Sequence, residues 1–473
     1  MNRRKFLKVA GGSLLGLSVG GCLESTRTSA SDIKQTQPNI LLIMVDDMGF
    51  SDLGCYGGNK QGIKTPNIDR MAAEGMRFTQ SYSGCTVCAP ARSTLMTGKH
   101  MGHTTVRGNT GGISLKADDI TIAQVLKKKG YATGGFGKWG IGDVRTEGVP
   151  EKHGFDVFFG YYHQIHAHNY WTDYLWRNSK KVFMAGEKGA MERYTHNRIF
   201  TETVDFIKEN HDKRFFCYCP WTPPHGNYQI PDDEPALAEF KDKSWTEKAK
   251  VLAAMFRIID RHVGEVLKLL KDLGIDEDTV VFFCSDNGGY RALDNFFNSN
   301  GPLRGQKTTL YEGGLRIPLI VRAPGRIKPS TTSDLLCYFP DIMPTLAELA
   351  EATEHVPTDI DGISIVPTLA GKDDIQKKHE YLYWEYPKYD WDKHQYVPTG
   401  PQQAVRMGKY KAVRLTFNGP FELYDLTTDV SETNNIADKH PDIVAKMQAI
   451  AGQAHEEPIP QIEPEMPEGK KFR

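Results

Sequence analysis

Two uninterrupted runs of apolar residues stand out in the hydrophobic pattern of the chain. Residues 39–45 read Asn-Ile-Leu-Leu-Ile-Met-Val, and residues 279–285 read Thr-Val-Val-Phe-Phe-Cys-Ser. Runs of this length predict strands buried on both faces, as in a largely parallel sheet. A further run at 215–220 predicts another core strand, and apolar positions spaced three and four apart over 248–273 predict an amphipathic helix against the sheet. The pattern therefore predicts an α/β fold.

Oxygen-bearing side chains follow both buried runs directly. Asp46 and Asp47 come after the first run, and Asp286 and Asn287 after the second. Ligands of open α/β sheets bind beyond the carboxyl ends of the strands, so we expect these side chains at one sheet edge. Adjacent aspartates are costly there unless a cation compensates them, and oxygen ligands without histidine or thiolate favour Ca²⁺ or Mg²⁺. The sequence thus predicts a metal site at these four residues.

The net charge of the chain and its N-terminal residues limit the classes of partner that it can bind. A formal net charge of -1 over 473 residues gives no global basic field, so we expect no nucleic-acid partner. Arg3 and Arg4 precede an apolar run at 9–19 that is too short to span a bilayer but has the size of a signal segment.

This N-terminal stretch resembles a twin-arginine lipoprotein signal. It covers residues 1–22 and ends in Gly-Gly before Cys22, and residues 23–38 have the composition of a flexible tether. We expect export by the twin-arginine route as a periplasmic or cell-surface lipoprotein, with membrane contact only through a lipid anchor at Cys22.

The stretch 88–98 carries the clearest candidate chemistry. Pro90 predicts a helix start, because proline is favoured in the first helical turn. Cys88 is then expected at the positive end of the helix dipole, and Arg92 one turn further, able to grip an oxyanion. The competing interpretations are a buried structural cysteine and a redox pair with Cys85, which lacks a thioredoxin-like context.

The same stretch resembles a family signature. Cys88-x-Pro90-x-Arg92, followed by Thr97-Gly98, is similar to the signature of the type I sulfatases of the alkaline phosphatase superfamily. The resemblance implies that a formylglycine-generating enzyme oxidises Cys88 to Cα-formylglycine, the catalytic nucleophile of that family. It also implies Ca²⁺ at the predicted metal site. The pattern is most similar to the arylsulfatase A and N-acetylgalactosamine-6-sulfatase branch.

Three downstream segments add residues to this site by resemblance. Residues 137–142 resemble the second family signature, which implies that Lys138 contacts sulfate oxygens. His225 follows two prolines after a predicted strand, and the resemblance implies that it protonates the bridging oxygen of the ester. Lys307 lies in a segment similar to the R-G-x-K element of the family, which implies a further contact with the sulfate.

Gly140 departs from the family pattern, which has a histidine at this place. Residues 163–171 pack three histidines and two aromatic residues together, and we interpret them as a substrate-pocket loop. We hypothesise that His166 or His168 replaces the missing histidine, and the sequence leaves both open.

The resemblance implies a fold and a reaction for the whole chain. We expect an alkaline-phosphatase-like α/β domain over 39–372, with a large mixed, mostly parallel sheet sandwiched by helices. A small C-terminal α+β subdomain with an antiparallel sheet is expected over 373–473. The implied function is a sulfuric ester hydrolase acting on a sulfated saccharide. The alternatives are a catalytically impaired surface glycan-binding lipoprotein, favoured by Gly140, and a phosphatase or phosphodiesterase of the same superfamily, disfavoured by Cys88 and the two lysines.

Overall fold

The computed structural model describes residues 37–110, 113–390 and 395–458. The expected signal at 1–22, with Cys22, lies outside these described residues, as does most of the expected tether, so export and lipid anchoring stay predictions. Within the described ranges, no helix has both the length and the apolar character needed to cross a membrane.

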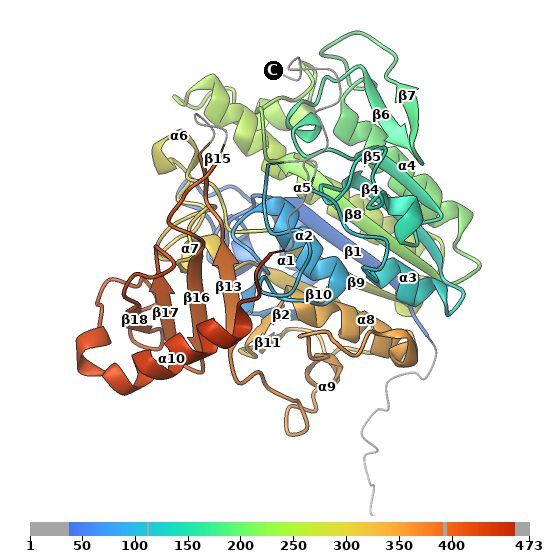
Figure 1. Ribbon diagram of the computed structural model, residues 1–473. Coiled ribbons are helices and arrows are strands. Elements are labelled where there is room, and N and C mark those ends of the chain that lie inside the picture. The colour runs from blue at the N-terminus through green and yellow to red at the C-terminus, as the bar shows by residue number, and fades with distance from the viewer. Residues whose placement is uncertain (1–36, 111–112, 391–394, 459–473) are drawn as a thin grey trace, which may run out of the picture. The chain divides into compact units, whose positions relative to one another are not determined.

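The centre of the fold is a ten-stranded mixed sheet with the order β11-β2-β10-β9-β1-β8-β4-β5-β6-β7 (Figure 1). In its middle, β1 (Asn39–Asp46) pairs in parallel with β8 (Phe215–Pro224) and with β9 (Thr279–Ser285). β4 (Ala132–Lys138) continues the parallel part beside β8, followed by β5 (Val157–Tyr161). The three apolar runs of the sequence are therefore neighbouring central strands, which confirms the predicted mostly parallel sheet.

Shorter strands extend the sheet at both sides, antiparallel to their inner neighbours except for β11, which pairs in parallel with β2. They are β10 (Leu319–Arg322), β2 (Met76–Phe78) and β11 (Thr331–Ser333) on one side, and β6 (Tyr174–Arg177) and β7 (Lys180–Phe183) on the other.

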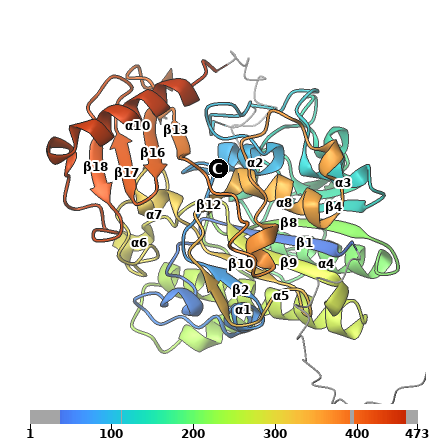
Figure 2. The same ribbon diagram turned by 90° about the horizontal axis from the view of Figure 1, so that it is seen from below.

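Helices cover both faces of this sheet, as Figure 2 shows. Alternate residues of β1 enter two separate apolar cores, with Ile40 and Leu42 in one and Leu41 and Ile43 in the other. This double burial is why successive positions in the central strands are all apolar. One helical layer contains α2 (Cys88–Thr97), α3 (Ile122–Lys127) and α8 (Ile342–Leu349), and the other contains α1 (Pro66–Ala73), α4 (Thr195–Glu209) and α5 (Glu247–Asp272).

A second, four-stranded antiparallel sheet follows in the C-terminal region and confirms the predicted fold class. It contains β13 (Leu382–Tyr386), β16 (Gln402–Met407), β17 (Tyr410–Arg414) and β18 (Glu422–Asp425), in that order. The helix α10 (Pro441–Ala454) packs Met447 and Ala451 against this small sheet. The division of the chain at residue 372 stays a prediction.

A buried ion network joins the small sheet to α7 (Glu312–Leu315). The Lys411 Nζ atom on β17 lies 2.9 Å from Glu312 Oε1 and 2.9 Å from Glu432 Oε1, and all three side chains are buried. Burial alone raises the pKa of Glu312, but Lys411 and neighbouring arginines outweigh it and lower that pKa to about 2. The small sheet is therefore anchored to the segment that follows Lys307, because removing either member of such a pair leaves an unpaired buried charge.

A half-buried histidine gives this region a pH-dependent contact. The Nε2 atom of His379, just before β13, lies 2.7 Å from Asp341 Oδ1. Burial tends to lower the pKa of His379, but the charge and hydrogen bond of Asp341 raise it above its ordinary value. A raised histidine pKa adds stability that is fully present below the unfolded pKa of about 6.5 and is lost as pH rises through the folded pKa. We therefore expect His379→Gln to lower the Tm more at pH 6 than at pH 9 in thermal unfolding.

The matched control is His211→Gln, at an exposed histidine that contacts the backbone oxygen of Lys208. It is expected to leave the Tm unchanged at both pH values. An equal loss of Tm for His379→Gln at both pH values contradicts a charge-dependent role.

Candidate active site

Cys88 lies where the central strands end and α2 begins. The helix starts at Cys88 itself, slightly before the proline that predicted it. The Cys88 Sγ atom is 3.2 Å from Asp46 Oδ1 at the end of β1, and the Lys307 Nζ atom is 3.2 Å from the same sulfur. Burial, with the charges of Asp286 and Asp46, raises the pKa of the Cys88 thiol far above its ordinary value. The unmodified thiol is therefore a protonated, weak nucleophile.

Arg92 forms ion pairs with two carboxylates. Its Nη2 atom lies 3.1 Å from Asp46 Oδ2 and 2.8 Å from Asp286 Oδ2, and its side chain is fully buried. Its Nη1 donates to the backbone oxygen of Lys138. The structure therefore differs from the predicted grip on an oxyanion, because aspartates from β1 and β9 already occupy these N–H groups. Arg92 fixes the two carboxylates beside Cys88.

The two predicted lysines complete a balanced cluster. The Lys138 Nζ atom, at the end of β4, lies 2.6 Å from Asp46 Oδ2, and the Lys307 Nζ atom lies 2.7 Å from Asp47 Oδ1. The centre thus combines three cations, Arg92, Lys138 and Lys307, with three carboxylates, Asp46, Asp47 and Asp286. The opposite charges of this cluster are therefore equal in number.

The four predicted metal-ligand residues converge at one edge of the sheet. Asn287 Nδ2 donates to Asp47 Oδ1 over 2.8 Å, and the Asp47 backbone N donates to Asp286 Oδ1 over 3.2 Å. Burial raises the pKa of Asp47 to about 6, helped by Asp46 and Asp286 and opposed by Lys307. Asn287 Oδ1 is buried and accepts no hydrogen bond from any residue in the described ranges. Crowded carboxylates and an unpaired amide oxygen fit a hard divalent cation.

His225 borders a cavity of about 390 Å³ next to this cluster. It follows directly on β8, and its Nε2 lies 3.5 Å from Asp47 Oδ2. Burial and the positive charge of Lys307 lower the pKa of His225 well below its ordinary value. A lowered pKa means that the protonated form of His225 gives up its proton readily.

Only one of the two loop histidines reaches the centre. His168 lines the same cavity, and its ring centroid is 4.6 Å from that of His225. His166 is buried among aromatic side chains, with its Nε2 2.6 Å from Thr172 Oγ1 and its ring centroid 5.1 Å from that of Tyr161. Of the two open candidates, the structure places His168 at the site and His166 in the supporting core.

Gln164 fills the space beside Gly140. A Cβ atom built on Gly140 lies 3.3 Å from Gln164 Oε1. Gln164 Nε2 donates to Asn109 Oδ1, which also accepts from the Ala89 backbone N over 3.0 Å. Gln164 lies in the predicted pocket loop, but no motif distinguishes it there, and Asn109 belongs to a distant segment.

Comparison with known proteins places the chain in a family. The family model described as Sulfatase matches residues 38–352, and the model described as N-sulphoglucosamine sulphohydrolase, C-terminal, matches residues 305–456. Arylsulfatase A of Homo sapiens is 32% identical over 451 residues, covering 84% of this chain and 83% of that protein. N-acetylgalactosamine-6-sulfatase of Mus musculus is 32% identical over 426 residues, covering 85% and 76%.

A solved structure shares the fold over most of both chains. The crystal structure of Ps i-CgsB in complex with k-i-k-neocarrahexaose superposes with a TM-score of 0.75 at 26% identity, covering 89% of this chain and 93% of that one.

Proposed function

Because the chain belongs to the sulfatase family, and so is a sulfuric ester hydrolase, we propose that it removes sulfate from a sulfated carbohydrate with a formylglycine made from Cys88 and a Ca²⁺ ion. The observation that carries this proposal is the position of Cys88. Its side chain lies at the start of α2, within 3.2 Å of both Asp46 Oδ1 and Lys307 Nζ. Relatives named for N-acetylgalactosamine-6-sulfate and a similar fold that binds a neocarrahexaose support a carbohydrate substrate.

The side chain at position 88 needs a second oxygen to complete a catalytic cycle. A formylglycine there supplies a hydrated aldehyde, in which one hydroxyl oxygen attacks sulfur and the other allows the sulfate to be released again. Asp46 Oδ1 accepts a hydrogen bond from the side chain of residue 88 and so orients it. The buried thiol of unmodified Cys88 has a raised pKa, which disfavours the thiolate, and it has no second hydroxyl group through which the sulfate could be released.

The cations around position 88 stabilise negative charge on the sulfate. Lys138 and Lys307 are fixed by Asp46 and Asp47 before substrate arrives, so they need no reorganisation during the reaction. Asp46, Asp47, Asp286 and Asn287 would hold a Ca²⁺ ion, which would supply Lewis-acid stabilisation of the negative charge. His225 gives a proton from Nε2 to the departing alcohol oxygen, which its place in the cavity wall allows.

The nucleophile is tested by Cys88→Ala. Protein co-produced with a formylglycine-generating enzyme is assayed for sulfate release from defined sulfated mono- and oligosaccharides, and the aldehyde at residue 88 is measured by mass spectrometry. We expect Cys88→Ala to lower the rate about a thousandfold or more, because the side chain forms the reactive bond. Cys55→Ala, at a half-buried cysteine in another part of the fold, keeps full activity.

Two results separate the alternatives. Release of phosphate but no sulfate identifies a phosphatase of the same superfamily. Saccharide binding without any release, despite a confirmed aldehyde, identifies a glycan-binding protein.

The metal is tested by chelation. We expect removal of Ca²⁺ to abolish sulfate release and lower the Tm, and Ca²⁺ to restore both, whereas Mg²⁺ at equal concentration restores less. A ligand that binds only the folded state adds about 2.7 kcal/mol at a hundred times its Kd. Asp47→Asn keeps the shape but removes a charge, so it raises the Ca²⁺ concentration needed for half of the Tm gain. Asp118→Asn, at an exposed aspartate, leaves that concentration unchanged. A Tm that chelation does not move contradicts the Ca²⁺ site.

A further inference from the structure

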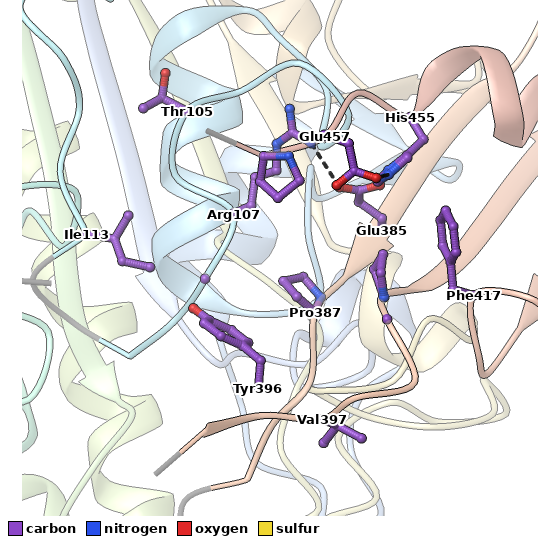
Figure 3. A pocket seen from close by; sticks show the side chains of 14 residues that line it. Thr105, Arg107, Ile113, Glu385, Pro387, Tyr396, Val397, Phe417, His455 and Glu457 are labelled. Carbon is purple, nitrogen blue, oxygen red and sulfur yellow. Dashed lines mark hydrogen bonds and ion pairs between the residues drawn. The ribbon is translucent and has the colours of Figure 1, made fainter. Parts of the chain in front are cut away.

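A second cavity, of about 490 Å³, lies between Thr105, Arg107, Gly108 and Ile113 on one side and the region of the small C-terminal sheet on the other (Figure 3). Figure 3 shows the rings of Tyr396 and Phe417 on two sides of it, with Pro387 and Val397 between them. Its volume lies in the range of pockets that enclose small organic ligands. None of its lining residues has a part in the proposed reaction.

At the polar end of this second cavity, the acidic and basic side chains pair with one another. Glu385 Oε1 lies 3.2 Å from Arg107 Nη1, and Glu385 Oε2 lies 2.6 Å from His455 Nδ1. Tyr383 donates a hydrogen bond to the same carboxylate over 2.7 Å, and Glu457 Oε1 lies 3.6 Å from His455 Nε2. Two acidic groups thus face two basic groups, and no excess positive charge is left to attract a sulfate or carboxylate. Apolar rings beside polar groups instead suit an uncharged sugar, which has one apolar face and a rim of hydroxyls.

The second cavity borders the catalytic centre through two short segments. Glu385 on β13 and Pro387 directly after it line the cavity, while Tyr386 between them faces the other way. The backbone oxygen of Glu385 lies 3.9 Å from the Sγ atom of Cys85, three residues before residue 88. Likewise Gly108 lines the cavity, while its neighbour Asn109 accepts from the Ala89 backbone N.

We propose that the second cavity binds an uncharged sugar unit of the same glycan chain that carries the sulfate ester, and thereby selects oligosaccharides over single sulfated sugars. This inference rests on the function proposed above, since it names a second contact of the same substrate. Phe417 is the specificity-determining residue, because its ring is held by contacts with His455, 4.9 Å away between centroids, and with Arg414.

The test compares two substrates of different length. We expect Phe417→Ala to raise KM for the best oligosaccharide of the sulfated panel about tenfold, with kcat nearly unchanged, because a stacking contact is lost. The matching sulfated monosaccharide keeps its kcat/KM. Phe417→Leu, which retains apolar volume, shows a smaller effect in the same direction. Phe183→Ala, at a 73% exposed aromatic residue on β7, changes neither substrate.

Direct binding separates this inference from the proposed function. Titration calorimetry of Cys88→Ala protein with the desulfated oligosaccharide requires no turnover, so it reports on the cavity even if sulfate release fails. Weaker binding by the Phe417→Ala, Cys88→Ala double variant supports the sugar site. Unchanged binding, or an equal loss of kcat/KM on both substrates, overturns it.

An independent observation concerns the acceptor beside Gly140. Gln164 is 4% exposed, and its Oε1 accepts no hydrogen bond from any residue that the structure describes. Its Nε2 donates to Asn109 Oδ1, and because Asn109 Oδ1 also accepts from the Ala89 backbone N, the orientation of both amides is fixed. A buried acceptor without a donor is costly, and such groups in native proteins call for an explanation.

The surroundings of this oxygen connect it to residue 88. The Cβ position of Gly140 lies 3.3 Å from Gln164 Oε1 and 3.5 Å from Arg92 Cδ. Arg92 binds Asp46, the same carboxylate that contacts Cys88. Gly140 has a φ of +80°, a backbone conformation in which a side chain is strained, so the space is left open for Gln164. The geometry points to Gln164 Oε1 as the acceptor for a hydroxyl of the hydrated aldehyde at residue 88.

An amide cannot take up the proton, so Gln164 orients the reacting hydroxyl. We expect Gln164→Ala to lower kcat about tenfold while KM and the aldehyde content at residue 88 stay unchanged. Gln164→Glu, which keeps an acceptor oxygen, retains more activity than Gln164→Ala. Gln61→Ala, at a half-buried glutamine that contacts the Phe296 backbone oxygen, has no effect on kcat.

Three results overturn this assignment: an unchanged kcat in Gln164→Ala, a loss that follows the aldehyde content, or a loss that follows the Tm. Because aldehyde content and Tm are measured on the same preparations, failed modification and failed folding are told apart from a lost contact.

Discussion

The structure depends on the neutralisation of buried charge at the carboxyl end of the central strands. Asp46 and Asp286 are fully buried and bind the same guanidinium of Arg92, while Lys138 makes a second contact with Asp46. Each of these groups is costly to bury alone, and removing one partner leaves another unpaired. The cluster therefore fixes β1, β4, β9 and the start of α2 relative to one another. The side chain at position 88 contacts two members of this charged centre, Asp46 and Lys307.

This requirement extends into the C-terminal region. Lys307 reaches the cluster from a loop that leads into Glu312, and Glu312 is bound by Lys411 of the small sheet. Trp384 on β13 also donates its indole N–H to the backbone oxygen of Ser83, close before α2. The small sheet is thus part of the framework that positions both the start of α2 and Lys307.

Local sequence patterns predicted the parts of this framework that depend on burial. The apolar runs predicted β1, β8 and β9, because a strand covered on both faces must be apolar at successive positions. Asp46 and Asp286 were placed at one edge for the same topological reason. The sequence does not predict the partners of Arg92. A guanidinium can bind either an anionic substrate or a carboxylate of the protein, and only the fold shows that Asp46 and Asp286 bind it. Gln164 was missed because its importance arises from Asn109, 55 residues away, and from the empty Cβ position of Gly140.

Charge neutrality at the centre also bears on where specificity arises. In the proposed reaction the balanced cluster contacts only the sulfate ester group, which all sulfated glycans share. Discrimination among glycans must then come from contacts outside the cluster, where the sugars differ in shape and hydroxyl pattern. The aromatic walls beside Glu385 and His455 are such contacts, and their own charges are paired, so they do not compete for the sulfate. Separating charge recognition from shape recognition lets one catalytic centre remain unchanged while the selecting surface varies.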